Sequence, residues 1–377
     1  MLLALALILA LVALPTQSAS AASNAGRWVT IQINSGVDTR VLTRENYWLR
    51  GRVLTTKGEP QANAKVRIFR YTKKGRTRVK TVRTAANGWY SWSPPKPRNG
   101  TYRAVVSKVR QSPKITVRKV TGSRSLASRE KSLRFLLGKP KGPVKRAKGL
   151  AWRDYAKGTL VKKAKRTWLV RGKPMKQMRK RGGPTGVLGP PTRDVRCGLP
   201  EGACLQQFRT GAVYTNKKAK KKVTWASAPK RGAADLVAVA KSQVGYREPK
   251  PRHSKYNRWI GRTGASDPWC GFFVSWLAHA AGKPKAVPKA KSFPALVSAE
   301  RKRGRTTSKP RVGRLAYIGY FVKGTPSHVG IVSKVEGDHV WTIEGNVSAG
   351  GGMMHPRGVH VVKRHRSNVV FYADPRY

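Results

Sequence analysis

The sequence predicts a multidomain protein with an N-terminal β-sandwich, a central repeat module and a C-terminal α+β domain. Three observations support this prediction. The chain has 377 residues, which is long for a single hydrophobic core. Residues 27–120 alternate between apolar and polar side chains, whereas residues 233–377 combine helical periodicity with strands. Two stretches rich in Lys, Arg, Gly and Pro, residues 121–149 and 217–232, separate these regions and predict extended basic linkers.

The charge of the chain is extreme. It contains 79 Lys and Arg residues against 15 Asp and Glu residues, which gives a formal net charge of +64. A balance this lopsided exceeds what a solvated surface needs, and it predicts a polyanionic partner. The sequence contains no recognition helix, zinc finger or RNA-stacking motif, so nucleic acid is the less favoured polyanion.

The N-terminus predicts export. Residues 1–14 are apolar, Pro15 follows, and Ala19-Ser20-Ala21 offers a cleavage site, so residues 1–21 have the pattern of a secretory signal peptide. The run is too short for an ordinary transmembrane helix, and a signal anchor is the alternative. No Lys or Arg precedes it, which leaves open a start further upstream. Wall polymers are abundant polyanions outside cells, so we expect a secreted, cell-wall-associated protein without an integral membrane span.

Short strands separated by Gly, Pro and Asn turns run through residues 27–120, as a β-sandwich requires. The segments RGRVLTTKGEPQANAKVRI, TAANGWYSW and NGTYRAVV resemble the carboxypeptidase-regulatory-like and transthyretin-like sandwich domains. This resemblance implies a fold and no activity, so the domain is expected to act as a spacer or a wall-adhering module.

Residues 150–216 contain an internal repeat, because YAKGTLVKKAK from Tyr155 aligns with FRTGAVYTNKK from Phe208. Repeats of this kind are stacking or binding units. The segment GGPTGVLGPPTRDVRCGLPEGACLQQFRTGAVYTN resembles the LGFP repeat of cell-wall proteins in its glycine pair, in VLGPP, in its two cysteines and in F-x-x-G-A-V-Y. The resemblance implies a non-catalytic module that associates with the cell wall.

The chain has three cysteines. Cys197 and Cys204 bracket GLPEGA, a glycine-containing loop that can bring them within bonding distance, and we expect a disulfide in an oxidising compartment. Cys270 is then left over. A leftover cysteine in a secreted protein suggests intermolecular pairing, a reactive thiol or a buried structural residue.

Two helices are predicted near Cys270. ADLVAVAKSQVG, from Ala234, has helical periodicity that ends at Gly245, and DPWCGFFVSWLAHAAG predicts a second helix with Asp267 as N-cap and Pro268 as first residue. Cys270 would lie in the first turn, where the helix dipole and unpaired backbone N–H groups stabilise a thiolate. The helix is apolar nearly all round, so core packing explains the position equally well. A base within reach would favour catalysis.

Of the seven histidines, His328 is the best candidate for that base. His279 projects from the same helix more than two turns away, and His355 to His365 fall in a basic tail where we expect solvent exposure. His328 opens the predicted strand SHVGIVSKV, with Gly330 leaving space on its face. A second strand, HVWTIEGNV, follows it.

The register of these two strands decides what lies beside His328. An odd loop places Gly330 opposite Glu344 and His328 opposite Asn346, whereas a two-residue loop sends His328 and Glu344 to opposite faces. We predict the odd loop, because only that register unites the apolar side chains on one face and the polar ones on the other. Glu344 would then orient the imidazole, as the third member of a triad does. The alternative is a surface carboxylate.

WCGFFVSWLAHAAG, then HVGIV, then IEGN resembles the CHAP domain, the cysteine and histidine dependent amidohydrolase/peptidase of the papain-like class, over residues 233–377. The resemblance implies Cys270 as nucleophile, His328 as general base and acid, Glu344 as imidazole partner and Asn346 as an accompanying polar residue. It also implies cleavage of an amide bond in peptidoglycan, at N-acetylmuramoyl-L-alanine or in a peptide crosslink. Neither a metal nor an organic cofactor is expected, since thiolate and imidazole supply the nucleophile and the proton shuttle.

Three other functional hypotheses compete with this prediction. One is a non-catalytic, cationic wall-binding protein that keeps a degenerate CHAP fold. Another is a cationic protein that acts on nucleic acid or membranes. The third is an NlpC-type peptidase, which shares the thiol and the imidazole, although IEGN after HVGIV suits CHAP better.

Overall fold

The protein is described by a computed structural model. It divides into two compact units, Met1–Val41 with Tyr47–Lys119, and Leu42–Asn46 with Val120–Tyr377. The predicted signal segment, residues 1–21, lies outside the described residues. The structure describes residues 29–33, 40–42, 47–72, 74–94, 99–107, 110–120, 125–229, 232–251, 253–262, 268–322, 324–352 and 354–377.

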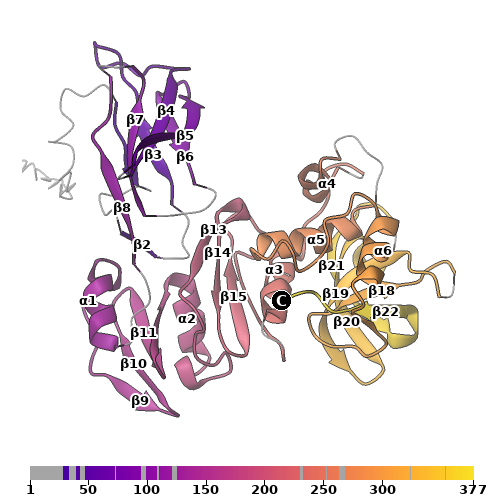
Figure 1. Ribbon diagram of the computed structural model, residues 1–377. Helices are drawn as coiled ribbons and strands as arrows, with labels where there is room; N and C mark the ends of the chain where they lie inside the picture. The colour runs from indigo at the N-terminus through magenta and orange to yellow at the C-terminus, as the bar shows by residue number, and fades with distance from the viewer. Residues whose placement is uncertain are drawn as a thin grey trace, which may run out of the picture. The chain divides into compact units, whose positions relative to one another are not determined.

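The N-terminal unit contains two sheets around one core (Figure 1). Leu49 and Tyr90 from one sheet pack in the same core as Val66 and Tyr102 from the other. The alternation of apolar and polar residues predicts this, because every second side chain of a strand faces the core. The family resemblance of this domain stays a prediction. One sheet has the order β1 (Gln32–Ile33), β3 (Leu49–Arg52), β6 (Trp89–Trp92), and the other the order β2 (Arg40–Leu42), β8 (Ile115–Val120), β7 (Gly100–Val105), β4 (Lys65–Thr72), β5 (Gly75–Arg83).

The central module is built from two four-stranded sheets with similar local structure. In both, a tight turn precedes the third strand: Tyr155 N–H donates to Gly158 at 2.8 Å, and Phe208 N–H donates to Gly211 at 2.8 Å. Two paired strands and a helix follow each turn, so the repeat seen in the sequence is also a structural repeat. The first set is β9 (Lys145–Ala147), β10 (Leu150–Asp154), β11 (Gly158–Lys163), β12 (Arg166–Arg171) and α2 (Gly172–Lys180); the second is β13 (Arg196–Leu199), β14 (Ala203–Gln207), β15 (Gly211–Thr215), β16 (Val223–Ser227) and α3 (Ala233–Gln243).

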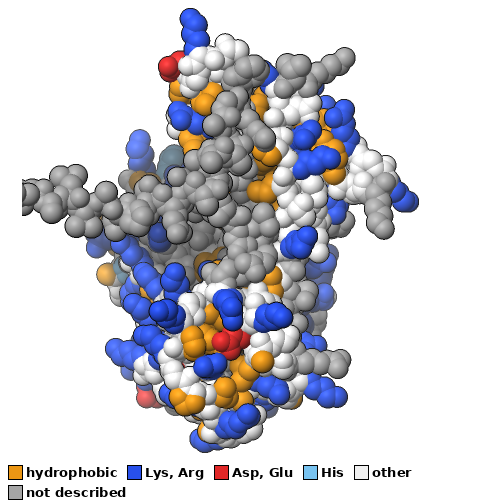
Figure 2. Space-filling view, turned by 90° about the vertical axis from the view of Figure 1, so that its left-hand side faces the viewer, with side chains coloured by type: hydrophobic (Ala, Val, Ile, Leu, Met, Phe, Trp, Pro, Cys, Tyr) orange, Lys and Arg blue, Asp and Glu red, His pale blue; other side chains and the backbone are white. Residues whose placement is uncertain are grey.

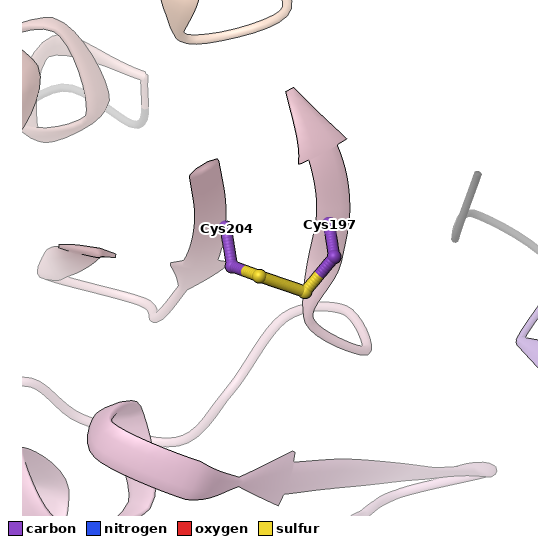
Figure 3. Close-up of a disulfide and its surroundings, with 2 residues drawn as sticks. All are labelled: Cys197 and Cys204. Carbon is purple, nitrogen blue, oxygen red and sulfur yellow. A yellow bond between two sulfur atoms is a disulfide. The ribbon is translucent and has the colours of Figure 1, made fainter. Parts of the chain in front are cut away.

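A disulfide joins Cys197 and Cys204, as their spacing predicts. The two residues are direct partners on the antiparallel strands β13 and β14, with Cα atoms 4.0 Å apart. Figure 3 shows their side chains reaching toward each other from the two strands. The bridge therefore closes a hairpin, with the glycine-containing loop at its end.

The region predicted as an extended linker over residues 121–149 contains a helix, α1 (Leu126–Leu137), and strand β9. Ser125 caps the helix by accepting a hydrogen bond from Ser128 N–H. Leu133 and Leu137 are buried in the core of the first sheet, and Arg129 forms a buried ion pair with Asp194. Burial of the apolar face of α1 stabilises a helix in this stretch despite its basic residues.

The second predicted linker, residues 217–232, also contains regular structure. Val223–Ser227 form β16, which pairs with β15 and places Trp225 opposite Val213. Because VTWAS has the alternation of a strand, it completes the sheet despite the lysines before it. This stretch therefore belongs to the second repeat.

The C-terminal domain has a six-stranded sheet with helices packed against it (Figure 1). Helix α3 lies between this domain and the second central sheet: it contacts β15 and β16 on one side and α5 and β19 on the other. Leu236, Val237 and Val239 of α3 are buried in the core that both regions share. The predicted boundary at residue 233 therefore does not separate two bodies. The sheet order is β17 (Thr306–Thr307), β22 (Val369–Ala373), β18 (Leu315–Ile318), β19 (His328–Glu336), β20 (His339–Val347), β21 (Gly358–His365), and the remaining helices are α4 (Lys255–Ile260), α5 (Cys270–Ala280) and α6 (Phe293–Lys302).

The surface reflects the composition. On the face shown in Figure 2, Lys and Arg side chains are spread over the described surface, and Asp and Glu side chains are few. Within the described part of the chain, no helix is both long and apolar enough to cross a membrane.

Candidate active site

Cys270 is the first residue of α5. The preceding residue, Trp269, has φ −105° and ψ 14°, so the helix begins two residues later than Pro268, where the sequence predicted it. Asp267, the predicted N-cap, lies outside the described residues. Cys270 is 2% exposed, and its position at the helix start leaves the backbone N–H groups of the first turn without helical acceptors. A thiol here lies beside backbone N–H groups that have no acceptor within the helix.

The β19–β20 hairpin has a two-residue turn, Gly337-Asp338, so the predicted odd loop is wrong. A β-bulge at Ser333 adds one residue to β19 and shifts the register between the turn and the site. Gly330 consequently lies opposite Glu344, as predicted. The bulge, and not the loop, supplies the extra residue that places Gly330 opposite Glu344. One extra residue on one strand exchanges the faces of all residues beyond it.

Gly330 makes room for the carboxylate of Glu344. A Cβ atom at Gly330 would lie 2.6 Å from Cγ of Glu344, closer than two carbon atoms approach in proteins. From the sequence, we expected the glycine to leave space beside His328. The structure instead shows that any larger residue here would displace Glu344.

His328 and Glu344 form a buried pair. Nε2 of His328 lies 3.0 Å from Oε2 of Glu344, and the side chains are 1% and 0% exposed. Nε2–H donates to the carboxylate, so the other ring nitrogen, Nδ1, is not bound by Glu344. Cys270 lies close enough for its charge to raise the pKa of the same imidazole.

The charges of these groups shift each other's pKa. Burial alone would lower the pKa of His328, but the Cys270 thiolate, and after it Glu344, raise the pKa of this imidazole to about 9. Burial would likewise raise the pKa of Glu344, but His328 and then Arg364 hold it at about 2. The arrangement therefore favours a protonated imidazole beside an ionised Glu344 at neutral pH.

Arg364 holds the other side of Glu344. Its Nε lies 3.0 Å from Oε1 and its terminal nitrogen 2.8 Å from Oε2, so the guanidinium binds both carboxylate oxygens. Thr342 also donates to Oε1. Arg364 in turn lies over the ring of Tyr320, 4.9 Å from its centroid, and donates to its hydroxyl. This fork fixes the carboxylate in one orientation.

Sequence reasoning missed Arg364, Thr342 and Tyr320. Arg364 lies in the stretch interpreted as a basic tail, which in fact forms β21 and pairs with β20. One arginine among 79 basic residues carries no signal of its own. Only the pairing of β20 with β21 could have placed it beside Glu344.

Asn346 is buried at a β-bulge between β20 and β21, with a left-handed backbone at φ 67°. It is therefore not the ladder partner of His328 that the sequence predicted. Within the described part of the chain, neither polar atom of its amide has a hydrogen-bond partner. A buried amide in a strained conformation costs free energy, so it is a candidate for binding a ligand.

The other histidines named in the sequence analysis lie elsewhere. His279 packs against Trp259 at 5.3 Å. His355 is 40% exposed and lies 3.0 Å from Oε1 of Glu248. No group of three or more His, Cys, Asp or Glu side chains among the described residues could hold a metal ion.

Comparison with known families identifies residues 262–346 as a CHAP domain. This stretch contains Cys270, His328, Glu344 and Asn346. The match supports a CHAP domain over this stretch and suggests a hydrolase of the amidohydrolase/peptidase type with peptidoglycan as its class of substrate. A search of curated proteins found no match. The LGFP-like module, the family of the N-terminal domain and the papain-like fold stay predictions.

Proposed function

We propose that this CHAP-domain protein is a secreted peptidoglycan hydrolase that cleaves an amide bond with Cys270 as nucleophile. One observation carries the proposal: helix α5, which starts at Cys270, packs against β19 and β20, the strands that hold the buried His328–Glu344 pair, and Cys270 lies close enough to raise the pKa of that imidazole. A nucleophile, a base and a group that orients the base are the set that nucleophilic acyl transfer requires.

In the proposed reaction, the Cys270 thiolate attacks the carbonyl carbon of the amide and forms a C–S bond. Backbone N–H groups at the start of α5 donate to the oxygen, which becomes negative as the tetrahedral intermediate forms. The C–N bond then breaks, and the leaving nitrogen takes a proton from the His328 imidazolium. Water next attacks the thioester and gives a proton to His328, and Cys270 leaves as a thiolate. The cycle thus returns Cys270 to the thiolate and His328 to the imidazolium.

Glu344 and Asn346 have supporting roles in this proposal. Glu344 holds Nε2–H of His328, so that Nδ1 faces the thiol and the substrate. The buried amide of Asn346, without a partner among the described residues, is available to bind a polar group of the substrate. Both roles position groups and need neither metal nor organic cofactor.

The rest of the chain would deliver the hydrolase to its polymer. An enzyme that acts on an insoluble substrate gains local concentration from attached binding modules. A net charge of +64 would retain it on anionic wall polymers, and this attraction should weaken as salt screens it. Retention on isolated cell walls that does not change with salt would contradict the electrostatic part of the proposal.

The direct test compares wild type with Cys270→Ala on purified peptidoglycan, with products identified by mass spectrometry. We expect wild type to release fragments with new amino and carboxyl ends, and the variant to lose at least about 10³-fold in rate while it keeps its binding to the wall. The masses also identify the bond that is cut. Binding without cleavage by wild type would instead support the non-catalytic wall-binding protein.

A further inference from the structure

A cavity of about 500 Å³ lies in the central module, beside the disulfide. Its wall comes from three segments: residues 171–174 where β12 meets α2, the disulfide hairpin, and residues 215–222 between β15 and β16. The volume falls within the roughly 300–1,000 Å³ of pockets that bind small ligands. It lies apart from the residues of the candidate active site and has no role in the proposed reaction.

The charged side chains around this cavity are almost all basic. Lys173, Lys217, Lys218 and Lys222 line it, are exposed and add to Arg171. Among the described residues of the wall, Glu201 is the one acidic residue, and its Oε1 lies 2.8 Å from Nζ of Lys255. Since that carboxylate is already neutralised, the concave surface presents a concentrated positive charge, and a low-dielectric wall strengthens its field.

Apart from Thr215 and Asn216, the remaining wall is apolar, and it contains no aromatic side chain among the described residues. Pro174, Val195 and the disulfide of Cys197 and Cys204 contribute to it. Nucleic acids that bind cationic grooves stack their bases on aromatic side chains, and such a platform is missing here. The surface instead suits closely spaced anionic groups on an aliphatic or sugar backbone.

The cavity is tied to the C-terminal domain. Lys255, which pairs with Glu201, is the first residue of α4, and its ammonium also lies 4.5 Å from the ring centroid of Trp276 on α5. Asn216 donates to the other oxygen of Glu201 at 2.6 Å. The same ion pair thus holds the cavity wall and the helix layer that carries Cys270.

We propose that this cavity is a binding site for an anionic wall polymer, whose phosphate or carboxylate groups pair with the lysines while its carbon backbone lies on the apolar wall. The inference extends the wall association in the proposed function. The two fail separately, because binding to the cavity breaks no bond, and a loss of hydrolysis leaves the cavity intact.

The test measures the Kd of the full chain for defined probes at about 0.15 M salt, where long-range surface attraction is largely screened. The probes are poly(glycerol phosphate) oligomers, oligogalacturonate and single-stranded DNA of equal charge. Tighter binding of the first identifies phosphate as the anionic group, and tighter binding of the second identifies carboxylate. Equal or tighter binding of DNA would overturn the proposal.

A matched pair of variants separates the cavity from the general charge of the chain. Lys217, Lys218 and Lys222 are replaced together by Ser in one variant. The control replaces three exposed lysines of the same module that do not line the cavity, so both lose the same charge. We expect the first to bind the preferred probe at least about tenfold more weakly and the control to change less than about twofold. Equal losses in both would overturn the proposal. The control lysines are Lys163, Lys165 and Lys180.

A third variant fills the cavity without changing charge. Thr215 lines the cavity on β15, and Thr215→Tyr would occupy part of its volume. We expect a loss of binding similar to that of the lysine variant, with thermal unfolding used to show that the fold is kept. Unchanged binding by a folded Thr215→Tyr protein would place the anion on an open surface and overturn the proposal of a cavity site.

Discussion

Two histidine–carboxylate pairs lie among the described residues of the C-terminal domain, and the difference between them shows what makes one a candidate for catalysis. His328 with Glu344 and His355 with Glu248 have the same N–O distance, 3.0 Å, and both carboxylates are buried. His328 is 1% exposed and lies close enough to Cys270 for the thiol to raise its pKa, whereas His355 is 40% exposed. A carboxylate orients an imidazole in both pairs, and only a nucleophile on the far side gives it a reaction to catalyse.

The second pair has a structural position of its own. Glu248 also accepts a hydrogen bond from the indole of Trp269 at 2.9 Å, and Trp269 immediately precedes Cys270. This contact anchors the start of α5. The first pair would therefore act on protons, and the second would hold the backbone beside the nucleophile.

The largest effect on the rate of hydrolysis is expected when His328→Ala and His355→Ala, made as two separate variants, are compared. His328→Ala should lower the rate of peptidoglycan hydrolysis at least about 10³-fold, because the general base and acid is lost. His355→Ala should lower it less than about fivefold, because its ring only covers Glu248. Product release from purified peptidoglycan measures both. Similar losses in the two variants would remove the distinction between the pairs.

Replacing the carboxylate of Glu344 should likewise lower activity more than replacing that of Glu248. Glu344→Gln keeps the shape but removes the charge that holds the imidazolium, so kcat should fall about 10²–10⁴-fold. The alkaline limb of the pH–rate profile should also move to lower pH, because the pKa of His328 loses one of its raising causes. Glu248→Gln should leave that limb unmoved and lower the melting temperature. A displaced alkaline limb in the Glu248 variant would contradict the division of roles.

Variants of Arg364 test how strongly kcat and stability depend on the orientation of Glu344. Arg364→Met leaves the buried carboxylate without two hydrogen bonds and should cost about 1–3 kcal/mol of stability and about tenfold in kcat. The pKa of Glu344 should rise, because Arg364 contributes to holding it low. Stability that a depressed carboxyl pKa contributes is lost as pH falls, so acid unfolding should begin at higher pH in the variant.

Arg364→Lys is the matched control, because it keeps the charge without the planar fork. It should recover the acid stability more fully than kcat. If both variants behave as wild type in the pH–rate profile and in acid unfolding, Arg364 has no positioning role.

The smallest effect is expected in the pH dependence of stability. The pKa of His328 is raised to about 9, chiefly by the Cys270 thiolate against the opposing effect of burial. A group with a raised pKa stabilises the fold fully below its unfolded value of about 6.5, and that stabilisation is lost as pH rises through about 9. Melting temperatures are measured between about pH 6 and pH 10. Their decrease with rising pH should begin at a lower pH in Cys270→Ala than in wild type. Superimposable curves would argue against a thiolate facing His328.

Sequence reasoning succeeded where short-range patterns determine structure. The apolar run after Cys270 predicted a helix that starts close to the thiol, and α5 begins at Cys270. The alternation around His328 and Glu344 predicted two paired strands. Helix and strand periodicities are readable from neighbouring residues, because each repeats within a few positions.

The same reasoning failed where one residue changes a register or where charge hides a pattern. The bulge at Ser333 leaves no clear sequence signal, and the register at Gly330 agreed with the prediction although the predicted loop was wrong. Lysines around VTWAS concealed β16, and basic residues around Leu133 and Leu137 concealed α1. Burial of a few apolar side chains decided these segments, and it depends on neighbours distant in sequence.

By itself the sequence determined that a helix starts close to Cys270, that His328 and Glu344 lie on paired strands, and that Cys197 and Cys204 can form a disulfide across one short loop. These features depend on spacings along the chain. The tertiary structure alone decided that Arg364 holds Glu344, that Glu248 anchors Trp269, and that α3 joins the central module to the C-terminal domain. Such contacts join residues far apart in the chain, where composition and periodicity carry no information about which partners will meet.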